Sequence, residues 1–180
     1  MQPPVAVLIA GLASRLGVPA FVAMCTDLMR GAERESYVEE LRSLTGHEWF
    51  PGDAVFDRSS WPDYWVRSWG ARGLLHVWDD SATTAVVTGL ADEHWRPAEM
   101  CLKVVARHDV AGAGDPAAVL LGHELPRVRA QALRALAVAG DTQHLGPVRA
   151  RLEDEDELVR RQAERALTAM ARRLDVDPGG

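Results

Sequence analysis

Lysine is almost absent from this chain. Lys103 is its single lysine, all other basic residues are arginine, and 26 acidic residues outnumber 20 basic ones. The net charge is −6 and the isoelectric point is near 5.5. A protein that works mainly by neutralising phosphates needs clustered basic side chains. This composition therefore disfavours a nucleic-acid-binding function.

Cysteine is also scarce. Cys25 and Cys101 lie far apart and neither belongs to a CxxC motif, which excludes a disulfide framework and a zinc ribbon and fits a reduced cytoplasm. The first residues lack the positive leader of a signal peptide. The apolar run 5–12 is followed by Arg15 and Gly17, before the roughly 20 residues that a membrane span needs. We predict a cytoplasmic protein without a membrane span.

Sequence motifs of common catalytic and metal sites are missing. The six histidines form no HExxH motif, and there is no GxSxG, P-loop or GxGxxG sequence. We therefore predict no metal, no cofactor and no complete catalytic set from this chain alone. The sequence defines no small-molecule ligand.

What the chain does contain is an internal repeat. Val-Arg pairs begin at Val66, Val128 and Val159. Pro97 stands midway between Val66 and Val128, where the same spacing would place a further pair. These positions define a period of about 31 residues, which is typical of solenoid proteins. Two columns of mostly small residues follow these positions at offsets of four and seven: Gly70, Cys101, Ala132 and Ala163, then Gly73, Val104, Ala135 and Ala166.

Each repeat predicts two helices. The offsets 0, 4, 7 and 8 trace one face of a helix, and small residues on that face permit close helix contact. The second helix follows an aspartate, at Asp79, Asp115 and Asp141, suited to accept hydrogen bonds from the first backbone N–H groups. No segment alternates with the period of a strand. The recurring arginines Arg67, Arg129 and Arg160 are expected to pair with acidic turns of adjacent repeats.

Residues 125–141 resemble a bacterial HEAT repeat of the type found in phycobilisome-lyase-like proteins, and residues 156–170 repeat the pattern. The resemblance extends over about residues 61–174 and is weakest at 97–121. It implies an all-α fold, a right-handed α-α superhelix of the HEAT-like solenoid class with a period of about 31. Residues 1–60 are predicted to form divergent N-terminal helices, one of them near 33–44, and an aromatic-rich connection over 46–60. Residues 175–180 are predicted to be a disordered tail, and the whole chain is predicted to be one continuous domain.

The N-terminal helices predict a second feature. The segment 5–13 is apolar around its whole circumference, so it must be covered, either by residues 1–60 themselves or by a second chain. The candidate residues of such a subunit interface, with a protein partner or in a homodimer, are Val5, Leu8, Ile9, Leu12, Phe21 and Met24.

Tryptophan is unusually frequent, with six residues. Spacing by four places three of them on one helix face, where they form either a packing seam or an aromatic-lined pocket. The candidate ligand- or partner-binding residues are Trp61, Trp65, Trp69, Arg67, His76, Trp78, Asp79, Asp80 and Trp95.

The favoured function is non-catalytic protein–protein interaction, as an adaptor or accessory subunit. An alternative is a subunit of a lyase-like or biosynthetic enzyme complex that contributes the Trp-rich region to a shared active site. A third hypothesis rests on similarity to HEAT-like alkylpurine DNA glycosylases, in which Trp65, Trp69 and Asp79 or Asp80 would form the site. The acidic composition disfavours it, since those enzymes need a basic groove.

Overall fold

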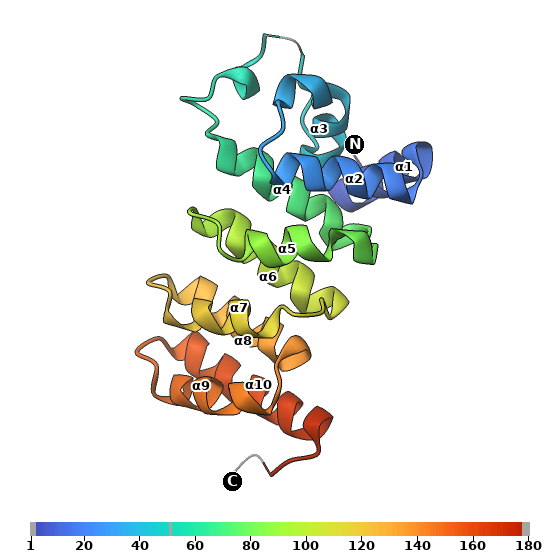
Figure 1. Ribbon diagram of the computed structural model, residues 1–180. Helices are drawn as coiled ribbons and strands as arrows, with labels where there is room; N and C mark the ends of the chain where they lie inside the picture. The colour runs from blue at the N-terminus through green and yellow to red at the C-terminus, as the bar shows by residue number, and fades with distance from the viewer. Residues whose placement is uncertain (1–2, 51, 178–180) are drawn as a thin grey trace. The chain divides into compact units, whose positions relative to one another are not determined.

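The computed structural model describes residues 3–50 and 52–177, and every regular element in these ranges is helical (Figure 1). The predicted all-α class is confirmed. The chain divides into two compact units, here called the N-terminal unit (Met1–Gly89) and the C-terminal unit (Leu90–Gly180). The predicted division at residue 60 does not coincide with this boundary. Of the predicted tail 175–180, residues 178–180 lie outside the described residues.

Helices of the N-terminal unit pack around α2 and α4. The elements are α1 (Val5–Leu16), α2 (Val18–Met29), the 3₁₀ helix η1 (Arg34–Tyr37), α3 (Val38–Thr45), η2 (Ala54–Phe56), α4 (Asp63–His76), η3 (Asp80–Ala82) and α5 (Thr83–Gly89). Residues 61–89 belong to this unit because α4 packs along α2. Its core includes Phe21, Leu28, Leu41, Leu44 and Leu74.

Within the described residues, no single helix is long and apolar enough to cross a membrane. Helices α1 and α2 reach that length and composition only when taken together, and they meet at a bend of 117°.

The contact between α2 and α4 depends on two glycines of the small-residue columns. A Cβ atom added at Gly70 would lie 2.6 Å from the backbone oxygen of Cys25, and one at Gly73 would overlap the Cys25 sulfur. Backbones therefore approach closely where the side chain is missing. The members of both columns in the C-terminal unit are also buried, as expected for positions between packed helices.

One buried arginine organises the segment between α2 and α4. Arg34 is 1% exposed and donates from Nη1 to the carbonyl oxygens of Val55 and Trp61, both at 2.6 Å, and from Nη2 to Asp63. Residues 34–37 form a 3₁₀ helix around this arginine, where the sequence pattern predicts one helix through 33–44. The aromatic-rich connection is thereby tied to the start of α4.

The C-terminal unit alternates long and short helices. Its elements are α6 (Trp95–His108), α7 (Gly114–Val119), η4 (Leu120–Gly122), α8 (Pro126–Ala139), η5 (Thr142–His144), α9 (Leu145–Ala150), η6 (Arg151–Glu153) and α10 (Glu157–Leu174). Helix α8 packs against both α6 and α10, so these three long helices lie side by side (Figure 1). The core includes Leu102, Leu133, Leu136, Val148 and Met170.

Two of the three aspartates that were predicted to cap helices do so. Asp79 accepts a hydrogen bond from the backbone N–H of Ser81, and Asp141 forms a capping box with His144. Asp115 instead lies inside α7, where its carboxylate accepts the His144 Nε2–H at 2.9 Å. The exception arises because a buried histidine needs a partner for its second ring nitrogen.

Prediction: Gly70→Ala destabilises the protein by about 1–3 kcal/mol, the usual cost of overpacking, because the methyl group meets a backbone atom that cannot rotate away. Gly11→Ala in α1 is the matched control, since only the tip of Arg15 lies within 4 Å of the added carbon. Chemical denaturation monitored by circular dichroism measures both. Equal stability of the two variants would show that the α2–α4 contact tolerates a side chain.

Candidate functional site

Three of the five candidate tryptophans come together, with one addition. Ring centroids are 5.4 Å apart for Trp61 and Trp65, 6.3 Å for Trp65 and Trp69, and 5.6 Å for Trp61 and Trp69. Trp49 joins them from the connection, 5.6 Å from Trp61 and 6.5 Å from Trp69. Trp61 does not share a helix with the others, because α4 begins at Asp63. We call these four residues the tryptophan cluster.

The geometry of the tryptophan cluster favours packing over a pocket. Trp69 is only 3% exposed, and the other three indoles are half-buried. The indole N–H of Trp49 donates to the Thr45 hydroxyl at 2.9 Å, and Arg42 donates to the Trp49 carbonyl oxygen at 2.6 Å. The cluster joins the connection to α3 and α4, which is the role of a hydrophobic seam.

The acidic residues proposed beside the tryptophans have local roles. Asp79 caps η3, and the hydrogen bonds from Ser81 lower its carboxyl pKa. Asp80 accepts the indole N–H of Trp78 at 3.0 Å. His76 is the last residue of α4, and Arg67 is half-buried on the same helix. This arrangement gives no support to the glycosylase-like hypothesis, since both carboxylates already serve the turn.

Trp95, which lies in the C-terminal unit, is flanked by two cations. The guanidinium carbon of Arg96 lies 4.4 Å from its ring centroid, and that of Arg127 lies 4.7 Å away. Arg127 also binds both carboxylate oxygens of Glu99 at 3.0 Å. The Arg127 side chain is still 56% exposed, whereas Glu99 is buried. We call Trp95, Arg96 and Arg127 the aromatic–arginine site.

Sequence reasoning named Trp95 but missed Arg127 and Glu99. The signal that could have found Arg127 is the repeat itself, because Arg96 and Arg127 are one repeat period apart and occupy equivalent helix positions. Equivalent residues of adjacent packed helices lie close together. The aromatic–arginine site therefore spans α6 and α8.

The predicted pairing of repeat arginines with acidic turns is confirmed for Arg129. Its guanidinium donates to both Asp154 oxygens, at 2.7 and 2.9 Å, and to the carbonyl oxygens of His123 and Glu124 at 2.9 Å. The hydrogen bonds with Asp154 raise the pKa of Arg129. Burial raises the pKa of Asp154, but hydrogen bonds from Arg129 and the Asp156 backbone, together with the charges of Arg129 and Arg151, lower it overall. Arg129 thus holds two turns together.

Both cysteines are core residues. Cys25 and Cys101 are free thiols and fully buried, and burial raises the pKa of each thiol far above its usual range. A thiol that stays protonated and inaccessible is a poor nucleophile.

The residues expected at a subunit interface are mostly internal. Ile9, Leu12, Phe21 and Met24 are at most 6% exposed, because α1 and α2 bury them within the N-terminal unit; Val5 and Leu8 are half-buried. The N-terminal unit thus covers most of these apolar side chains by itself. The large apolar side chains that α1 and the start of α2 leave exposed are Val7, Leu16 and Val18.

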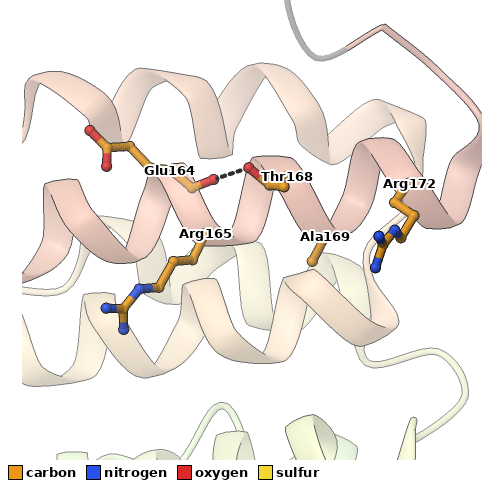
Figure 2. A pocket seen from close by; sticks show the side chains of 5 residues that line it. All are labelled: Glu164, Arg165, Thr168, Ala169 and Arg172. Carbon is orange, nitrogen blue, oxygen red and sulfur yellow. Dashed lines mark hydrogen bonds between the residues drawn. The ribbon is translucent and has the colours of Figure 1, made fainter.

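A shallow hollow of about 560 Å³ lies on the outer side of α10 and is lined by Glu164, Arg165, Thr168, Ala169 and Arg172 (Figure 2). Figure 2 shows Arg165 and Arg172 on the same side of the helix, with Ala169 between them. Thr168 donates to the Glu164 carbonyl oxygen at 2.9 Å. This polar surface contrasts with the stripe of apolar residues of α10 that is buried: Val159, Ala163, Ala166, Leu167, Met170 and Ala171.

The family model for HEAT repeats matches residues 115–177, from the first turn of α7 to just beyond α10. The match thus covers 63 of 180 residues, all in the C-terminal unit. Among curated proteins, none matches the chain.

Prediction: Trp69→Ala lowers the free energy of unfolding by about 3–5 kcal/mol, as for other buried aromatic residues. Phe50→Ala is the control. Its ring is 53% exposed and contacts the Arg42 guanidinium, so its loss costs about 1 kcal/mol or less. Denaturant titrations measure both. A small cost for Trp69→Ala would mean that the cluster is a surface feature and not a seam.

Prediction: the Arg129–Asp154 pair makes stability depend on acid pH. A lowered folded-state pKa means that the stabilisation is complete above the unfolded value of 3.8 and is lost as pH falls through the lower folded value. Asp154→Asn costs about 3 kcal/mol at neutral pH, because it leaves the buried guanidinium with only the exposed Glu155 as a counter-charge. The variant should also lose less stability than the wild type when the pH falls below ~4.

The matched control for that experiment is Glu164→Gln, which removes the same charge from an exposed position of α10. Its unfolding free energy, followed by urea titration between pH ~3 and ~7, should track the wild type. If Asp154→Asn and the wild type lost stability in parallel on acidification, the pair would not be the acid-sensitive element.

Proposed function

We propose that this chain is a non-catalytic protein-binding module, an adaptor or the accessory subunit of an enzyme. The proposal is supported by the HEAT-repeat match at 115–177, since repeats of this kind commonly serve as protein-interaction scaffolds. The resemblance of residues 125–141 to repeats of phycobilisome-lyase-like proteins favours the accessory role. The two buried free thiols are compatible with a reducing compartment such as the cytoplasm.

The observation that carries the proposal is the aromatic–arginine site. Tryptophan and arginine are among the residue types most enriched in binding hot spots. Here Arg96 and Arg127 flank Trp95 on a half-exposed surface, and Glu99 holds the guanidinium of Arg127 in place. A side chain that is already positioned loses little conformational entropy when a partner binds. The site is therefore suited to anchor a polypeptide.

Prediction: Trp95→Ala weakens binding of the natural partner about thirtyfold, which corresponds to about 2 kcal/mol for a hot-spot residue. The tagged chain is first used to capture the partner from native lysate, and mass spectrometry identifies it. Calorimetry with both purified proteins then measures the affinity. If that partner is an enzyme whose activity needs this chain, the accessory-subunit role follows.

Phe50→Ala is the control for this binding test, because it removes an exposed aromatic ring from the N-terminal unit. It should leave the affinity unchanged. The proposal fails if no partner is recovered in stoichiometric amount, or if Trp95→Ala binds as tightly as the wild type while remaining folded.

A further inference from the structure

Basic side chains line one side of the three long helices of the C-terminal unit. Lys103 of α6, Arg134 of α8 and Arg165 of α10 occupy the same repeat position, each one repeat period after the last. Arg107 and Arg172 extend the row along their own helices, at helical offsets of four and seven. We call these five residues the basic face.

The contacts of Arg127 establish the register between α6 and α8. Arg127 touches Trp95 and Glu99, so the start of α8 lies beside the start of α6. Arg134 lies two helical turns further along α8, on the same side as Arg127. Lys103 lies one turn beyond Glu99 and forms an ion pair with it at 3.5 Å. Lys103 and Arg134 therefore lie on adjacent helices at a similar height.

The register between α8 and α10 follows from Arg173. Its guanidinium donates to the carbonyl oxygens of Ala137 and Gly140, at the end of α8. The two helices therefore end side by side, which sets Arg165 next to the middle of α8. The basic face thus crosses all three helices.

Most of this charge is exposed and uncompensated. Arg107, Arg134, Arg165 and Arg172 are exposed, and within the described part of the chain none of them forms an ion pair. By contrast, the inward-facing Arg129 is fully paired with Asp154. Of the carboxylates beside the face, the buried Glu99 is already held by Arg127 and Lys103. The exposed Glu164 lines the same hollow as Arg165 and Arg172 but forms no ion pair with either in the described chain. The face is therefore locally cationic although the chain is acidic.

We propose that the basic face binds an acidic helical segment of a partner protein, which lies across α6, α8 and α10. This inference rests on the proposed protein-binding function and specifies the partner's chemistry. Packed helices are about 8–10 Å apart, and seven residues of an α-helix span about 10.5 Å. Acidic side chains spaced by one heptad would thus meet successive cationic groups. An extended strand covers the same distance in three residues, which alternates its side chains between faces.

The probe is a fluorescent alanine-based helical peptide of about 22 residues, with glutamates at heptad spacing along one face. Anisotropy at low ionic strength measures its binding to the full chain. We expect saturable binding that weakens as salt is added, because exposed ion pairs are screened. R134E/R165E should raise the dissociation constant by about tenfold or more, since it replaces two attractive charges with repulsive ones.

R15E/R30E is the matched control. It changes the net charge of the chain equally, at two exposed arginines of the N-terminal unit, and should leave peptide binding unchanged. Circular dichroism verifies that both double variants are folded. If R134E/R165E is not folded, the neutral variant R134Q/R165Q is used in its place. Equal binding by the two double variants overturns the proposal, and so does tighter binding of a duplex DNA of equal charge at the same face.

This experiment separates the two proposals. If the partner captured through Trp95 binds R134E/R165E with wild-type affinity, the acidic-segment inference fails while the protein-binding function stands. If both the partner and the acidic peptide lose affinity for R134E/R165E, the two sites belong to one interface.

Discussion

Close contact between helices at small residues is the constraint on which the rest of this structure depends. In the N-terminal unit, the missing side chain at Gly70 lets α4 lie against the backbone of Cys25. This contact sets the position of α4, and α4 in turn presents Trp65 and Trp69 to the aromatic-rich connection. A larger residue at the contact would move the helix, and the tryptophan cluster would lose its packing. The geometry of the seam thus depends on Gly70, the residue that follows Trp69 in the chain.

Buried guanidinium groups take over where regular structure ends. Arg34 and Arg129 each bind two carbonyl oxygens of turns or connections and at least one carboxylate. Backbone carbonyl groups in such segments have no helical partner and would be costly to bury unpaired. An arginine supplies several donors in a fixed plane, so a single side chain can satisfy them together. The turns of both units are ordered by this chemistry.

Regular features of the fold could be predicted from the sequence, and singular ones could not. The long helices and the ion pair of Arg129 with Asp154 follow from a pattern that recurs with the repeat period. A prediction made from one repeat can therefore be compared with the equivalent residues of the others. Arg34 and Trp49 have no repeated counterpart, and they contact Val55 and Trp69, which lie far along the chain. Contacts of this kind cannot be predicted from a periodic sequence pattern. The prediction that Trp61 shares a helix face with Trp65 and Trp69 was wrong for a local reason. Pro62 precedes α4, so the helix begins only at Asp63.

Net charge also proved a poor guide to any single surface. The chain carries −6 overall, yet electrostatic interactions in salt solution fade over about 8–10 Å. A ligand on one face therefore experiences mainly the charges of that face. In α8, Arg129 turns toward Asp154 and contributes no outward field, whereas Arg134 faces solvent without an acidic partner in the described chain. Two arginines of one helix thus stabilise the fold and shape its surface, respectively. Only their positions relative to the turns distinguish these roles.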